Sequence, residues 1–196
     1  MLSKGGRFLW LSCLAAILGT GATEHNQDIS LFIHNMCKDT RTFAIYQVSQ
    51  GQMLLSSPKL PLAHDTTGTL RSSYKLAGLR LSSNGDWPLD MHWSSQSLFE
   101  YGYSTYAGVE GVAYDLSIMG HGQELVGIAV QPLENGRGSG ECPTKMCIPG
   151  ECDPTQGWTH ETQEAAGSPA DTACFKGSTD FKVTYCPENL VVETHF

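Results

Sequence analysis

The sequence has few basic residues for its length. Its 196 residues include 12 Lys and Arg against 20 Asp and Glu, which gives a formal net charge of −8. Nucleic acids and anionic membrane surfaces attract proteins that carry basic patches, so this balance argues against both as partners. The sequence also lacks a glycine-rich phosphate loop, an internal repeat and an Asn-x-Ser/Thr sequon. We therefore expect no nucleotide site and no N-linked glycan.

Long apolar runs are also scarce, and the one sustained run lies near the N-terminus. It spans residues 8–18, follows Lys4 and Arg7, and precedes small residues that end at Ala22. This order is typical of a secretory signal peptide, and the run is too short for a comfortable membrane span. A signal anchor is the alternative. We expect a signal peptide over residues 1–22, a single domain over residues 23–196 and a secreted, extracellular or cell-wall location.

Paired Cys-x2-Cys units are absent, which argues against a zinc site. Of the seven cysteines, Cys13 lies in the expected signal peptide, so an even number remains. An even number in an exported chain predicts three disulfides, for which the sequence alone allows fifteen pairings. We expect no metal and no other cofactor. The remaining cysteines are Cys37, Cys142, Cys147, Cys152, Cys174 and Cys186.

Helical periodicity is almost missing after residue 22, whereas short segments that alternate apolar and polar residues are frequent. Such segments, separated by turn residues, predict an antiparallel β-sandwich or barrel. Residues 132–172 are rich in Gly, Pro, Cys and charge, and we expect a loop region that disulfides hold in order. The expected strands cover residues 28–34, 41–48, 67–73, 75–81, 123–130 and 181–185, with two more inside 97–120.

The two strands within 97–120 predict their own register, because the apolar sets of both should face the core. A slip of one residue would turn one apolar set outward, whereas a slip of two residues would move the two carboxylates further apart but keep them on one face. In the expected register Glu100 lies directly opposite Asp115 on the other face, where two like charges are unfavourable unless they are solvated, share a proton or bind a cation. The expected apolar pairs are Phe99 with Leu116, Tyr101 with Tyr114 and Tyr103 with Val112.

Glu100 and Asp115 are the candidate catalytic residues, since glycoside hydrolysis needs a proton donor of raised pKa beside a second carboxylate. The simpler alternative is a pair of solvated strand charges, or a structural pair held by Arg80. Trp87 and Trp93 could stack on sugar rings or plug the sandwich edge, and His92 could shuttle protons or be merely exposed. The candidate binding residues are Arg80, Trp87, Trp93, His92 and Tyr101.

Three blocks of sequence resemble one family. The block HNMCKDTRTFAIYQV, the pair LFEY and AYDLSIMG, and the block CFKGSTDFKVTYCP are similar to the opening, central and closing blocks of thaumatin-like proteins. They look closest to the small fungal branch of antigenic thaumatin-like secreted proteins and yeast-phase-specific antigens. The resemblance implies a thaumatin-type β-sandwich. It also implies the disulfides Cys37 with Cys186, Cys142 with Cys174, and Cys147 with Cys152.

Full-length members of that family line an acidic cleft with one Arg, one Glu and three Asp, and they are associated with binding and sometimes hydrolysis of β-1,3-glucan. Glu100 and Asp115 match two of these residues, and Arg80 matches the Arg. The two other Asp and the cysteine-rich second domain have no counterpart. The resemblance thus implies a secreted fungal protein, expected to be monomeric, that binds cell-wall β-1,3-glucan through an acidic cleft with weak or no hydrolysis.

Two alternatives stay open at this stage. The first is an acid/base enzyme of small-molecule metabolism, such as a cyclase or condensing enzyme, that uses the same carboxylates on a small ligand. The second is an effector or adhesin whose surface binds a host protein.

Overall fold

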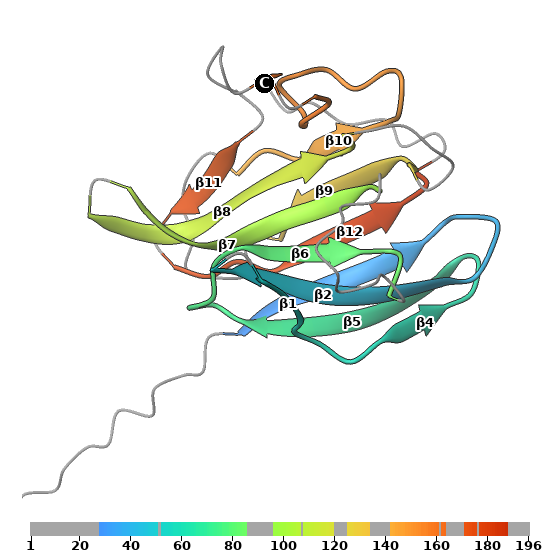
Figure 1. Cartoon of the computed structure of the whole chain (residues 1–196), viewed down its shortest axis with the longest axis horizontal. Coiled ribbons are helices and arrows are strands. Elements are labelled where there is room, and N and C mark those ends of the chain that lie inside the picture. The colour runs from blue at the N-terminus through green and yellow to red at the C-terminus, as the bar shows by residue number, and fades with distance from the viewer. Residues whose placement is uncertain are drawn as a thin grey trace, which may run out of the picture.

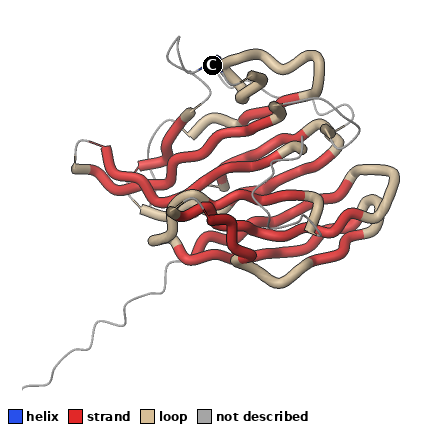
Figure 2. The backbone as a smooth tube through the Cα atoms, in the orientation of Figure 1, coloured by secondary structure: helices blue, strands red, loops and turns tan. Residues whose placement is uncertain are grey.

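The computed structural model describes residues 28–50, 52–85, 96–106, 108–119, 125–133, 142–160, 162–163, 171–175 and 177–187. Their backbone forms strands joined by turns and loops (Figure 2). The expected signal peptide and the candidate residues Trp87, His92 and Trp93 lie outside the described residues. The described part of the chain contains no helix with the length and apolar composition that a membrane crossing requires.

The strands form two sheets that pack face to face (Figure 1). The five-stranded sheet contains, in spatial order, β10 (Lys145–Cys147), β9 (Ile128–Pro132), β12 (Phe181–Tyr185), β1 (Asp28–Asn35) and β5 (Thr66–Ser73). The seven-stranded sheet contains, in order, β11 (Thr172–Phe175), β8 (Val109–Ser117), β7 (Leu98–Tyr106), β6 (Leu79–Ser82), β2 (Arg41–Ser49) and β3 (Gln52–Leu55), with β4 (Leu60–Leu62) also paired to β2.

An aromatic cluster fills the space between the sheets. Phe99 stacks on Tyr101 with ring centroids 5.0 Å apart, and Phe181 from the opposite sheet meets Phe99 edge-on at 5.1 Å. Tyr185 is fully buried, and its hydroxyl donates to the carbonyl oxygen of Leu81 at 2.9 Å. Because side chains alternate along a strand, the odd-numbered residues of β7 that build this core leave its even-numbered residues on the outer face.

The expected all-β sandwich is confirmed, and so is the register of the β7–β8 hairpin. Phe99 pairs with Leu116, Tyr101 with Tyr114, and Glu100 with Asp115. β7 ends at Tyr106 and β8 begins at Val109, with Gly108 at a φ of 78°. Positive φ is readily adopted by glycine, which explains how the chain reverses in so short a connection.

Three details differ from the expectation. The sandwich is not wholly antiparallel, because β1 and β12 pair in parallel. The two strands lie far apart in the sequence, so no short hairpin connects them and forces them to run in opposite directions. The strand expected over 75–81 begins only at Leu79, because the backbone of Ala77 crosses over Gly102. The strand expected over 123–130 begins at Ile128, and the expected loop region also contributes β10 and the start of β11.

The six described cysteines pair as the resemblance to thaumatin-like proteins implies. Disulfides join Cys37 to Cys186, Cys142 to Cys174, and Cys147 to Cys152. The first lies just beyond the last register pair of β1 and β12, where the backbone N–H of Met36 donates to the carbonyl of Tyr185 at 3.0 Å. The second links β11 to the segment before β10, and the third closes the turn after β10.

Candidate functional site

Three charged side chains stand in one row across the outer face of the seven-stranded sheet. Arg80 on β6 pairs in register with Glu100 on β7, and Glu100 pairs with Asp115 on β8. The residues that flank the row along each strand belong to the core, so alternation directs the row away from it. We call Arg80, Glu100 and Asp115 the charged row.

Arg80 and Glu100 form an ion pair within this row. The Arg80 Nε lies 2.9 Å from the Glu100 Oε1, and each side chain is only 23% exposed. Partial burial reduces screening by water, so the attraction between the two charges is stronger than in an exposed pair. Glu100 is therefore held in one place by its neighbour on β6.

The row continues toward two charged residues that sequence patterns did not single out. β11 pairs with β8 so that Thr172 faces Tyr114, and continuing this register places Asp171 beside Asp115. Lys145 on β10 is 2% exposed, and its ammonium donates to the carbonyl of Thr155 at 3.2 Å. Both charges act on Asp115 electrostatically.

The environment of Asp115 favours its protonated form. Burial raises the pKa of Asp115 to about 8, with further increases from Glu100 and Asp171, while Arg80 and Lys145 act in the opposite direction. One of its oxygens, Oδ1, is buried and has no hydrogen-bond partner among the described residues. An unpaired buried oxygen is better tolerated on a neutral acid than on an anion, which agrees with the direction of the shift.

Glu100 differs from Asp115 although the two face each other. Burial also raises the pKa of Glu100, and Asp171 adds to this, but the Arg80 guanidinium acts against both. Because Arg80 pairs directly with Glu100, a single proton shared by the two acids is better placed on Asp115. Environments that separate two neighbouring carboxyl groups in this way are typical of acid/base pairs.

Burial also lowers the pKa of Lys145, while Asp115 and Asp171 partly offset that effect. Lys145 was absent from the sequence-based candidates because it lies in the region expected to be loop. A lone lysine among glycines, prolines and cysteines gives no signal that it will be buried.

Tyr101 does not belong to the site. It is 4% exposed, stacks in the core, and its hydroxyl lies 2.9 Å from the Ser72 Oγ. The expectation that Tyr101 contacts a ligand is therefore corrected, because the odd-numbered residues of β7 face the opposite sheet. Burial also raises its pKa.

The charged row can make hydrogen bonds of three kinds. Protonated Asp115 can donate and accept, Glu100 can accept, and the Arg80 guanidinium donates. Directly opposed residues in an antiparallel pair have Cβ atoms roughly 4.5–5.5 Å apart, which is near the carboxyl separation of about 5–5.5 Å in retaining glycosidases. Among the described residues, no group of three His, Cys, Asp or Glu side chains is placed to hold a metal ion.

Comparisons with known proteins give structural neighbours only. No family model matches the chain, and no curated protein matches its sequence. The fold is similar to that of the protein elicitor MoHrip2 from Magnaporthe oryzae, with a TM-score of 0.49 and 14% identity over 81% of this chain and 98% of that chain. It is also similar to the thaumatin-like xylanase inhibitor TLXI, with a TM-score of 0.47 and 13% identity over 80% of this chain and 99% of that chain.

Proposed function

We propose that the chain is a secreted protein that binds cell-wall polysaccharide, namely β-1,3-glucan, through the charged row, with weak or no hydrolysis. The observation that carries the proposal is the register that places Asp115 beside the ion pair of Glu100 and Arg80 on one sheet face. A sugar presents hydroxyl groups that both donate and accept. Adjacent donors and acceptors on a fixed sheet face are complementary to such groups.

The charge state of the row favours a neutral, polyhydroxylated ligand over an ionic one. Asp115 is largely uncharged at neutral pH, and the Glu100 carboxylate is balanced by Arg80. A ligand of strong charge of either sign would disturb this balance, whereas a neutral glucan would not. The three disulfides support secretion, because such bonds persist in oxidising compartments.

Weak hydrolysis follows from the same ion pair. A retaining mechanism needs a carboxylate that is free to attack the anomeric carbon. The Glu100 carboxylate accepts from the Arg80 Nε–H over 2.9 Å, and both side chains are largely buried. Attack would require that this pair be broken, so we expect binding to exceed turnover.

The test is a pull-down of the oxidised protein on insoluble β-1,3-glucan, chitin and cellulose, with released reducing sugar assayed in the same tubes. Glu100→Gln and Asp115→Asn are the site variants, and Lys182→Ala on the opposite sheet is the control. The proposal expects glucan binding that both site variants weaken and the control retains. Absence of binding to all three polysaccharides would contradict it and favour a protein partner.

A second candidate is an acid/base enzyme that acts on a small molecule at the same row. The pKa of about 8 for Asp115 favours it, because a group that stays protonated at neutral pH can act as a general acid. Sugar release that Asp115→Asn abolishes would identify a hydrolase. A wild-type protein that ignores glucan but shows a bell-shaped pH dependence on a small carbonyl substrate would support the second candidate.

A further inference from the structure

Beyond the end of β11, Trp158 pairs with the edge of β8. It forms an isolated parallel bridge with Ser117, in which its N–H donates to the Leu116 carbonyl at 2.7 Å and its carbonyl accepts from Ile118 N–H at 2.9 Å. Bridge partners direct their side chains to the same face of a sheet, and Ser117 shares its face with Asp115 two residues earlier. Trp158 therefore lies on the same outer face as the charged row.

The indole of Trp158 is tied to the acid nearest the row. Its Nε1 donates to the Asp171 Oδ1 at 2.7 Å, and the register of β11 places Asp171 beside Asp115. The hydrogen bond pairs the one polar atom of the indole. It also holds the ring close to Asp171, which lies beside Asp115. Trp158 is half-buried, so the residue is not wholly enclosed by the core.

The segment that presents Trp158 is packed tightly. A Cβ on Gly157 would lie 2.7 Å from the Cys147 Sγ and 2.9 Å from the Leu116 carbonyl oxygen, so the backbone approaches both closely. Cys147 is itself joined to Cys152. The Gln163 amide donates to the carbonyls of Pro154 and Gly157 at 3.1 and 3.0 Å. An aromatic ring held in this way loses little entropy when a ligand binds.

We propose that Trp158, oriented by Asp171, is the aromatic floor of a pyranose subsite next to the charged row. The apolar face of one glucose ring stacks on the indole, and the hydroxyl groups of that ring or its neighbour bond to Asp115 and Glu100. Aromatic side chains with a few placed polar groups are the usual lining of such sites. This inference rests on the proposed function and assigns the stacking role to Trp158.

The test is calorimetric titration of a soluble β-1,3-gluco-oligosaccharide into the secreted protein. Trp158→Ala should weaken binding about ten-fold, the loss expected for one aromatic contact, whereas Trp158→Phe should stay within about three-fold of wild type. Asp171→Ala should weaken binding less than Trp158→Ala, and Asp171→Asn, which keeps an acceptor oxygen, should bind as wild type. Phe32→Ala, an aromatic 41% exposed on the opposite sheet, is the matched control.

A ligand-dependent change in tryptophan fluorescence is a second readout, and a loss of folding would not produce it. In a Trp87→Phe/Trp93→Phe background, saturating oligosaccharide should shift the emission of Trp158, with a midpoint equal to the calorimetric dissociation constant. If wild type binds glucan and Trp158→Ala binds it with the same affinity, the subsite is overturned but the proposed function stands. Failure of the wild type to bind would overturn both. Near-UV circular dichroism verifies that each variant keeps its fold.

Discussion

Asp115 lies in an environment that differs from that of an ordinary strand-face carboxylate. It faces Glu100 across the hairpin and neighbours Asp171, which directly precedes β11. The cations Arg80 and Lys145 act on its pKa in the opposite direction to these two acids. Its raised pKa means that the folded state binds a proton that the unfolded chain releases near pH 4. Stability from this group is therefore complete below about pH 4 and is lost progressively as pH rises from about 4 to about 8.

The first prediction concerns the pH dependence of thermal unfolding. Asp115→Asn mimics the protonated acid, so its melting temperature should match wild type near pH 3, below the unfolded pKa, and exceed it at pH 8 by at least about 3 °C, the shift that roughly 1 kcal/mol produces in a domain of this size. Differential scanning calorimetry at both pH values measures the difference. A gap that is equal at pH 3 and pH 8 would refute the protonated state.

The second prediction concerns the ion pair beside it. Arg80→Met leaves the Glu100 carboxylate partly buried without its cation and should destabilise the fold by about 1–2 kcal/mol. Arg80→Met/Glu100→Met removes both charges and should recover at least half of that loss. Urea unfolding of the two single variants and the double variant gives the coupling free energy. Strict additivity would show that the pair does not interact.

At the scale of elements, the hairpin was predictable and its neighbours were not. Alternation of aromatic residues from Phe99 to Tyr103 set the core face, which placed Glu100 and Asp115 together on the other face without reference to the rest of the chain. Asp171 and Trp158 lie on the same face but come from a region of sequence with no sustained apolar periodicity. β11 is four residues long and follows a long non-repetitive segment, so no local pattern could indicate that it pairs with β8.

The parallel pairing of β1 with β12 is another difference at the level of elements. Both strands were expected from their alternation, but alternation carries no information on strand direction. The disulfide implied between Cys37 and Cys186 did bring the two strand ends together. The disulfide joins residues that follow Asn35 and Tyr185, so both strands must run toward it. The implied disulfide therefore already indicated that the two strands run parallel.

The third prediction tests the close approach of the 76–78 turn to β7. A Cβ on Gly102 would lie 2.7 Å from the Ala77 Cα, a backbone atom that cannot move aside alone, so Gly102→Ala should destabilise the protein by more than about 2 kcal/mol. Gly108→Ala is the contrast, because a Cβ there meets nothing within 4 Å and only the positive φ is strained, at about 1 kcal/mol. Urea unfolding that ranks the two variants in reverse order would exclude the clash.

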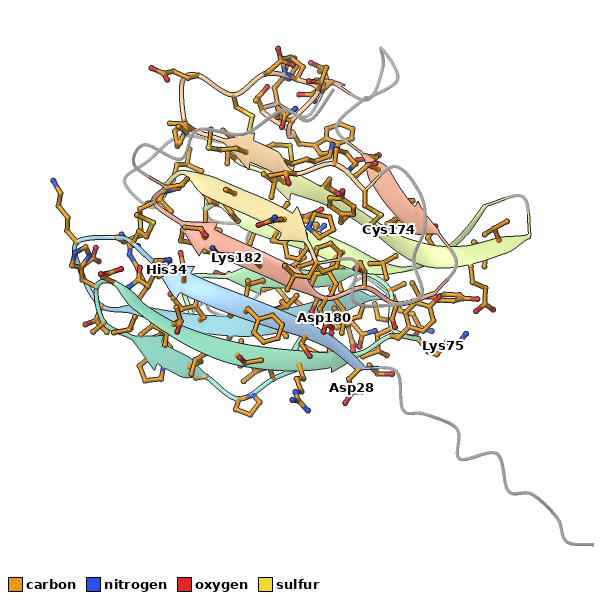
Figure 3. All side chains as sticks on the ribbon, turned by 180° about the vertical axis from the view of Figure 1, so that it is seen from behind. Asp28, His34, Lys75, Cys174, Asp180 and Lys182 are labelled. Carbon is orange, nitrogen blue, oxygen red and sulfur yellow. A yellow bond between two sulfur atoms is a disulfide. The ribbon has the colours of Figure 1, made fainter. Side chains whose placement is uncertain are left out.

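At the scale of the whole molecule, the first and last described strands, β1 and β12, are joined by a disulfide at one end of the five-stranded sheet. Figure 3 shows this sheet from behind, with His34 and Lys182 labelled on its neighbouring strands β1 and β12. The Cys37–Cys186 bridge spans 149 residues of sequence, whereas Cys147–Cys152 spans 5. The longer loop restricts the unfolded chain far more, so the first bridge should dominate the stability contributed by disulfides.

The fourth prediction follows from this difference. Replacing Cys37 and Cys186 with Ser should lower the free energy of unfolding by on the order of 3 kcal/mol more than replacing Cys147 and Cys152. Urea unfolding of both double variants under oxidising conditions measures it. Equal losses would mean that local packing, not chain closure, sets the contribution of each bridge.

The central claim is that the charged row on the seven-stranded sheet binds β-1,3-glucan. Its most direct test is the dissociation constant of a soluble β-1,3-gluco-oligosaccharide for wild type, Glu100→Gln and Lys182→Ala, measured at pH 6 in one buffer. We predict that Glu100→Gln weakens binding at least about ten-fold, because a charge-assisted acceptor is lost, while Lys182→Ala on the far sheet leaves it unchanged. Equal affinity for wild type and Glu100→Gln would contradict the claim.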